Sequence, residues 1–88
     1  MFFTYILRSL KDNSFYIGSA KDLNKRLAKH NKGLVKSTKH HSPFEIVYYE
    51  KFNTLSEVRK RESQIKNWKK RKAIENLIRK SDIPNLPR

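Results

Sequence analysis

Four side chains in the first third of the chain combine proton-transfer groups with a strong anion binder. Tyr16 and Arg26 lie in the stretch Phe15–His30, FYIGSAKDLNKRLAKH, and His30 follows Arg26 one helical turn later. Tyr5 precedes Tyr16 by eleven residues. Phenol and imidazole groups can exchange protons, and a guanidinium forms paired hydrogen bonds to anionic oxygens. These residue types therefore suit a site that acts on an anionic ligand.

Glu62 stands where the sequence predicts an apolar residue. Thr54 and Glu57 form a capping box, which predicts the start of a helix that extends to about Lys70. Apolar residues recur along this helix at helical spacing and predict its buried stripe: Leu55, Val58, Ile65 and Trp68. At about 100° per residue, Glu62 projects between the first two of them. Its carboxylate is explained either by metal binding or by an ion pair, for which Lys66 is one candidate.

The tyrosines require a hairpin to bring them together. Phe2–Ser9 and Phe15–Ser19 are rich in aromatic and β-branched residues and predict two antiparallel strands joined by a turn at Leu10–Ser14. If the connection has an even number of residues, both tyrosines lie on one face of the sheet. A third strand is predicted over Phe44–Phe52. Because its middle is apolar on both faces, we expect it to be the central strand.

The first helix must carry Arg26 and His30. Ser19 or Asp22 can cap a helix that ends near Lys32, with Gly33 supplying the left-handed residue after it. On this helix Leu23 and Leu27 define the buried stripe, with Arg26 and His30 toward its edge. The polar, basic stretch Leu34–Pro43 is expected to be an exposed loop. A last helix is predicted over Ala73–Ile78, within one domain of residues 1–80, and 81–88 is expected to be a loose tail.

Charge points to a polyanionic partner. The 88 residues contain 21 Lys and Arg against 8 Asp and Glu, a formal net charge of +13 that makes nucleic acid the first candidate. Cysteine is absent, so a disulfide framework and thiolate zinc sites are excluded. The apolar start MFFTYIL lacks the features of a signal peptide or membrane span. We expect a cytoplasmic protein that needs neither a membrane nor an obligate protein partner.

The order and spacing of these motifs resemble those of the GIY-YIG endonucleases, in particular the short single-domain members. The resemblance rests on Phe3-Thr4-Tyr5, Tyr16-Ile17-Gly18, Arg26, His30-Asn31-x-Gly33 and Arg61-Glu62, and it extends to about Lys70. Phe3 departs from the glycine of the family name. The family fold implies an α+β architecture, a small three-stranded antiparallel sheet flanked by helices, which agrees with the elements read from the residues.

The resemblance also implies roles for individual residues. Tyr5, Tyr16, Arg26, His30 and Glu62 would form the catalytic site, with Arg26 on the scissile phosphate and Glu62 on one divalent metal. Many members place an asparagine beyond the glutamate, and neither Asn67 nor Asn76 aligns convincingly with it. Our choice of general base is Tyr16, with Tyr5 assisting. The ordinary pKa of a tyrosine is about 10, so acting as a base near neutral pH requires positive charge nearby.

The expected activity is metal-dependent endonucleolytic hydrolysis of DNA, with DNA favoured over RNA and branched or damaged structures among the substrates. The acidic residues are too scattered for a two-metal site, so a single Mg²⁺ is favoured, with Mn²⁺ as an alternative. The alternatives are a nucleic-acid-binding module with little or no turnover and a basic domain for an acidic protein or anionic lipid. Basic side chains from three segments are expected to contact nucleic acid: Lys25, Arg26, Lys36, Lys39, His40, Lys66 and Lys69.

Overall fold

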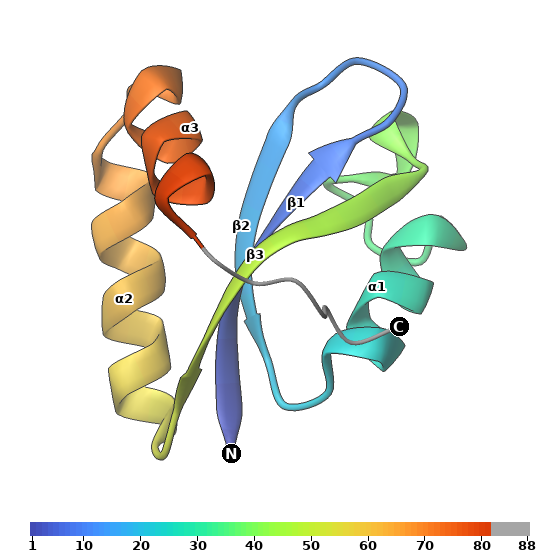
Figure 1. Ribbon diagram of the computed structural model, residues 1–88. Helices are drawn as coiled ribbons and strands as arrows, with labels where there is room; N and C mark the ends of the chain where they lie inside the picture. Colours follow the sequence, from blue (N-terminus) through green and yellow to red (C-terminus); the bar gives the residue numbers. More distant parts are fainter. Residues whose placement is uncertain (82–88) are drawn as a thin grey trace.

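The fold is built on a three-stranded antiparallel sheet. A computed structural model describes residues 1–81, with strands β1 (Phe2–Ser9), β2 (Phe15–Ala20) and β3 (Phe44–Phe52) in the order β2-β1-β3 (Figure 1). The prediction that β3 is central was wrong, because β1 pairs with both other strands. A strand that is apolar on both faces is covered on both faces, but it can still lie at an edge of the sheet. Helices on both sides of this sheet contact β3.

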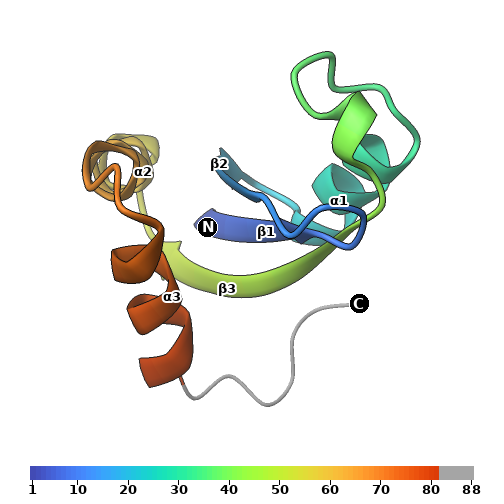
Figure 2. The same ribbon diagram turned by 90° about the horizontal axis from the view of Figure 1, so that it is seen from above.

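Helices lie on both faces of the sheet. Helix α1 (Leu23–Asn31) covers one face, and α2 (Leu55–Asn67) and α3 (Arg71–Lys80) cover the other (Figure 2). The α+β architecture expected from the sequence is therefore confirmed. No helix within residues 1–81 is long and apolar enough to cross a membrane.

The alternating faces of the strands produce two separate hydrophobic cores. On the α1 face the buried members are Tyr5, Leu7, Leu23, Phe44 and Ile46. On the face of α2 and α3 they are Ile6, Ile17, Tyr48, Ile65 and Ile74. Side chains of consecutive residues in a strand point to opposite faces, so Tyr5 and Ile6 belong to different cores. The tyrosines thus face α1, whereas Glu62 belongs to a helix on the other face.

The local signals at the helix ends are confirmed. Asp22, not Ser19, caps α1 by accepting a hydrogen bond from the backbone N–H of Lys25 at 3.0 Å. Gly33 follows the helix with φ of +75°. Thr54 caps α2 by accepting from the N–H of Glu57 at 3.2 Å. These short-range signals therefore located both helix starts correctly.

Three expectations for individual segments need correction. Leu55 is 41% exposed, because it is the first residue of α2 and stands outside the core that Val58 and Ile65 enter. Helix α2 ends at Asn67, and Lys69 adopts a left-handed backbone with φ of 53°. The loop after Gly33 is not wholly exposed: it contains a short 3-10 helix, η1 (Lys39–His41), and Thr38 before it is buried. Of the expected loose tail, only Ser81 lies within the described residues.

Candidate active site

The β1–β2 hairpin places the two tyrosines on one face of the sheet, as predicted. Tyr5 is opposite Gly18, and Leu7 is opposite Tyr16. Side chains two residues apart share a face, so Tyr5, Leu7 and Tyr16 all point toward α1. The rings of Tyr5 and Tyr16 lie 6.4 Å apart between centroids. Tyr5 is 1% exposed, whereas Tyr16 remains partly accessible.

Gly18 makes room for the Tyr5 side chain. A Cβ atom built on Gly18 would stand 2.5 Å from the Tyr5 hydroxyl oxygen and 2.7 Å from Cζ. The Tyr5 ring therefore crosses directly over the β2 backbone. Only a residue without a side chain permits that path. The position of Tyr5 on β1 therefore requires glycine at the paired position, Gly18, on β2.

Helix α1 brings Arg26 and His30 to the same hydroxyl group. Arg26 Nε donates to the Tyr5 hydroxyl oxygen at 3.3 Å, and His30 Nε2 lies 3.1 Å from it. The His30 ring is also 4.9 Å from the Tyr16 ring. His30 is fully buried. Four of the five predicted site residues thus form one contiguous cluster.

Burial and charge set the protonation states in this cluster. Burial raises the pKa of Tyr5 to about 12, although Arg26 opposes the shift. Burial, reinforced by the Arg26 charge, lowers the pKa of His30 to about 4. The hydrogen bond to Tyr5 raises the pKa of Arg26, and Tyr16 contributes to this effect. Near neutral pH the cluster therefore holds a protonated Tyr5, a neutral His30 and a charged Arg26.

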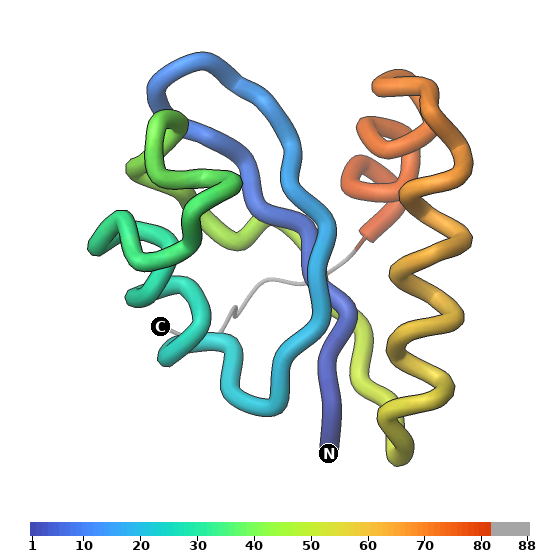
Figure 3. The backbone as a smooth tube through the Cα atoms, turned by 180° about the vertical axis from the view of Figure 1, so that it is seen from behind, coloured from blue at the N-terminus to red at the C-terminus, as the bar shows by residue number. Residues whose placement is uncertain are grey.

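Glu62 approaches the cluster from the opposite layer, past the free edge of β2. Figure 3 shows this strand between α1 and α2. Glu62 lines a cleft of about 440 Å³ with Ser19, Arg59, Ser63, Lys66 and Asn67. Its charge is among the causes that raise the pKa of Tyr5, so the carboxylate lies within electrostatic reach of the phenol. Lys66 pairs with Glu62 at 2.7 Å, as the ion-pair alternative anticipated.

Ser19 joins this cleft to a second one on the α1 side. The second cleft, of about 290 Å³, is lined by Ser19 and by residues of the turn and helix that follow: Ala20, Lys21, Asp22, Lys25, Arg26 and Lys29. Arg26 and Glu62 therefore stand on opposite sides of the end of β2, each in a cleft that includes Ser19.

A sequence profile described as the GIY-YIG catalytic domain matches residues 1–76. The chain belongs to the GIY-YIG family. Its relatives include UPF0213 proteins of Staphylococcus saprophyticus and Staphylococcus aureus, 45% and 44% identical over 73 residues. In both comparisons the match covers 82% of this chain and 88% of the relative.

A solved structure has the same fold. The solution NMR structure of a UPF0213 protein from Bacillus halodurans matches with a TM-score of 0.59 and 31% sequence identity. The match covers 96% of this chain and 89% of that one. The sheet and helices described above are therefore those of a GIY-YIG protein.

The basic residues predicted to contact nucleic acid in this GIY-YIG protein fall into three groups. Lys25 and Arg26 line the cleft on the α1 side. Lys66 lines the Glu62 cleft, with Lys69 just beyond the end of α2. Lys36, Lys39 and His40 are exposed on the loop before β3. The sequence reasoning missed Lys21, Lys29 and Arg59, which also line the two clefts. Charge alone does not distinguish them from other surface lysines and arginines.

The donor set around Glu62 fits one hard cation. Mg²⁺ is commonly held by one or two carboxylates, water and substrate phosphate. Of the residues that the structure describes, Glu62 is the sole acidic one lining its cleft, where Ser19, Ser63 and Asn67 supply further oxygen atoms. Residues 1–81 contain no cluster of three His, Asp or Glu side chains able to hold a metal without substrate. A cation at Glu62 would displace the amino group of Lys66.

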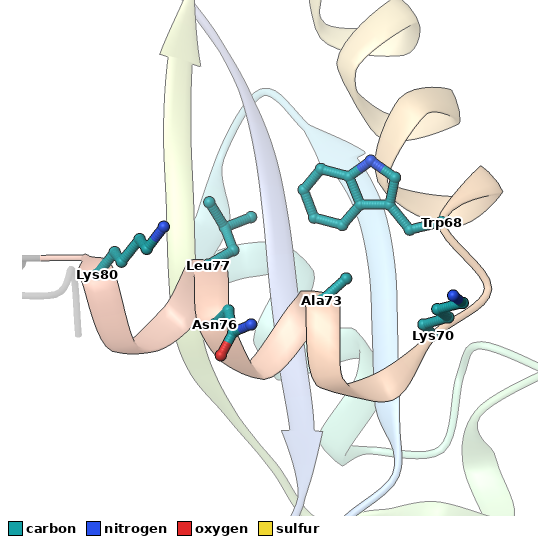
Figure 4. A pocket seen from close by; sticks show the side chains of 6 residues that line it. All are labelled: Trp68, Lys70, Ala73, Asn76, Leu77 and Lys80. Carbon is teal, nitrogen blue, oxygen red and sulfur yellow. The ribbon is translucent and has the colours of Figure 1, made fainter.

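The two asparagines left open by the sequence are separated by the fold. Asn67 lines the Glu62 cleft. Asn76 lines a larger cleft of about 520 Å³ between the end of α2 and α3, together with Trp68, Lys70, Ala73, Leu77 and Lys80 (Figure 4). Among residues 1–81, no acidic residue or histidine lines that larger cleft, so its size does not make it the candidate catalytic site. Asn67 is the asparagine that the fold places beside the glutamate.

Proposed function

We propose that the protein is a metal-dependent endonuclease that hydrolyses phosphodiester bonds in DNA, including branched or damaged structures. The observation that carries the proposal is the state of Arg26. Its Nε is bound to Tyr5, and no acidic side chain within residues 1–81 forms an ion pair with it. The terminal nitrogens of the guanidinium are thus available to two oxygens of a phosphate.

Hydrolysis needs a deprotonated water, a stabilised phosphoryl group and a protonated leaving oxygen. The water oxygen bonds to phosphorus while the bond to the leaving oxygen breaks. Tyr16, in its phenolate form, is the proposed acceptor of the water proton, because it is partly accessible and lies beside the Arg26 charge, and it can return that proton to the leaving oxygen. Tyr5 is buried and hydrogen-bonded on both sides, so it supports Arg26 and does not meet the water. Arg26 stabilises the negative charge on the phosphoryl oxygens.

Glu62 is the proposed ligand of the single divalent metal, with Mg²⁺ favoured over Mn²⁺. When bound, such an ion neutralises phosphoryl charge and assists the leaving oxygen. Lys66 pairs with the carboxylate in its absence. Asn67 and Ser63 can orient water or phosphate in the same cleft. This arrangement requires substrate and metal to enter together, because one carboxylate alone is a weak Mg²⁺ site.

The alternative is a GIY-YIG module that binds nucleic acid without useful turnover. The Glu62–Lys66 pair favours this alternative, because the Lys66 amino group occupies the carboxylate that is proposed to bind the metal. A substrate panel separates the two functions: single-stranded, duplex, flap and junction DNA, with RNA counterparts, each in Mg²⁺, Mn²⁺ or chelator. The nuclease hypothesis predicts cut DNA that requires a divalent metal. Binding with no cut product in any arm would establish the binding module instead.

A further inference from the structure

A chain of hydrogen bonds extends from the loop after α1 to Arg26. His30 Nδ1 lies 2.8 Å from Thr38 Oγ1, and Thr38 Oγ1 donates to the backbone carbonyl of Val35 at 3.3 Å. On its other side His30 Nε2 meets the Tyr5 hydroxyl, which in turn accepts from Arg26 Nε. Thr38 is 2% exposed and His30 is fully buried. Solvent is therefore excluded from the middle of this series of hydrogen bonds.

The bond that Thr38 donates to Val35 sets the direction of the bonds that follow it. Thr38 Oγ1 donates its one proton to the Val35 carbonyl, which also accepts from the Thr38 backbone N–H at 3.0 Å, so Thr38 accepts from His30. In a neutral imidazole the proton is then on Nδ1, which leaves Nε2 as an acceptor. Tyr5 accordingly donates its proton to His30. The free lone pairs of its oxygen face Arg26, whose Nε–H can only donate.

We propose that Thr38 is a positioning residue for Arg26: by holding His30 in the Nδ1–H tautomer, it orients the Tyr5 hydroxyl that anchors the guanidinium. This inference rests on the proposed role of Arg26 in binding the scissile phosphate. Thr38 touches neither the phosphate nor the water. Its effect passes through two buried side chains whose hydrogen-bond directions cannot change independently.

The other tautomer disrupts the anchor. With the proton on Nε2, His30 and Arg26 would both direct N–H groups at the Tyr5 oxygen. The Tyr5 hydroxyl proton would then have no acceptor on the imidazole. It would have to turn toward the side of the oxygen that Arg26 Nε–H occupies. The guanidinium would then lose its fixed orientation, and a misplaced phosphate binder slows the reaction more than it weakens binding.

The loop is held in place by contacts that do not involve Thr38. Asn31 Oδ1 accepts from the backbone N–H of Phe44 at 2.6 Å, and its Nδ2 donates to the Phe44 carbonyl at 3.3 Å. His41 Nδ1 lies 2.6 Å from Asp12 Oδ2. A change at Thr38 can therefore alter the tautomer while both ends of the loop stay attached.

The test compares Thr38→Val, which keeps the shape and removes the hydroxyl, with Thr38→Ser, which restores it. Long-range ¹H–¹⁵N NMR spectra of the whole protein report the His30 tautomer directly. The matched control is Thr4→Val, because Thr4 is also buried and donates to a backbone carbonyl, that of Val58, at 2.8 Å on the other face of the sheet.

We expect the Nδ1–H tautomer in the wild type, in Thr38→Ser and in Thr4→Val, and the Nε2–H tautomer in Thr38→Val. In cleavage assays Thr38→Val should lower kcat at least tenfold and change KM less than threefold, while Thr38→Ser recovers most of the activity. An Nε2–H tautomer in the wild type, or an unchanged tautomer in Thr38→Val, would overturn the proposal. If the wild type does not cut DNA, the nuclease hypothesis fails while the spectra still decide the tautomer.

Discussion

At the scale of single residues, two neighbouring tyrosines have different proposed roles. Tyr5 is buried, and its hydroxyl is committed to His30 and Arg26. Tyr16 is the more accessible phenol. We expect Tyr16→Phe to reduce metal-dependent cleavage at least tenfold with little change in DNA affinity, because the lost group acts on the transition state.

The matched control is Tyr49→Phe, since Tyr49 packs on the same face of the sheet, 5.8 Å from the Phe3 ring. Cleavage rates at saturating DNA should be unchanged in this control. Undiminished cleavage by a folded Tyr16→Phe protein would remove Tyr16 from the role of general base.

Arg26 should be sensitive even to replacement by lysine. A guanidinium can keep one N–H on Tyr5 and present two others to phosphate, whereas an ammonium is a single point charge. We expect Arg26→Ala and Arg26→Lys each to lower the single-turnover cleavage rate at least tenfold. Equal rates for Arg26→Lys and the wild type would show that charge alone suffices there.

At the scale of elements, the hairpin depends on Gly18 for a steric reason. Gly18→Ala would place a Cβ 2.5 Å from the Tyr5 hydroxyl oxygen. The strand must shift or Tyr5 must leave its position, so cleavage should fall at least tenfold. Gly33→Ala is the contrasting variant: its φ of +75° makes alanine cost about 1 kcal/mol of stability, with cleavage retained. Urea unfolding and cleavage are measured on both variants. Cleavage should be lost in Gly18→Ala and retained in Gly33→Ala, which should show only the loss of stability.

Burial of His30 should make the packing of α1 on the sheet sensitive to pH. The pKa of His30 is about 4 in the folded protein against 6.5 in its ordinary state. Between these values the unfolded chain binds a proton that the folded chain excludes, so stability falls as the pH drops from 6.5 to 4. The full shift corresponds to about 3 kcal/mol.

Urea unfolding from pH 7 to pH 4 measures this effect, with His30→Gln as the comparison. Subtracting the variant's curve removes the contributions of other titrating groups, including the His41–Asp12 pair. A difference that does not vary with pH would mean that the pKa of His30 is the same in the folded and unfolded states.

Local and periodic features of the sequence predicted most of the fold. The capping box at Thr54, the cap at Asp22 and the terminating Gly33 are signals within a few residues, and their geometry appears in the structure. The shared face of Tyr5 and Tyr16 followed from strand periodicity. The central place of β1 did not, because strand order depends on which edges pair and not on how apolar a strand is.

The parts of the site that were missed depend on long-range packing. Thr38 lies in a polar loop with no periodicity, and nothing local marks it as the buried partner of His30. The cleft residues Lys21, Lys29 and Arg59 are typical surface residues in sequence. Their common position follows only from the way α1 and α2 flank the end of β2.

At the scale of the whole molecule, the net charge of +13 should appear in the salt dependence of binding. Within the described part of the chain, six lysines and arginines line the two clefts that meet at Ser19: Lys21, Lys25, Arg26, Lys29, Arg59 and Lys66. If each neutralises one phosphate of duplex DNA, log K should fall against log salt with a slope of about −5. The affinity should be nearly the same for unrelated sequences. A slope of about −1 or shallower would mean that these clefts do not hold the nucleic-acid backbone.

The nuclease hypothesis is tested by DNA cleavage by Glu62→Gln in Mg²⁺, measured beside the urea unfolding curve of this variant in chelator. Glu62 pairs with a lysine whose side chain is 49% exposed, so losing this pair should cost about 1 kcal/mol or less. Glu57→Gln is the control, because Glu57 lies on the same helix outside both clefts. We expect a normally stable Glu62→Gln protein that binds DNA and does not cut it. Metal-dependent cutting at the wild-type rate by this variant would show that Glu62 is not the metal ligand of a nuclease.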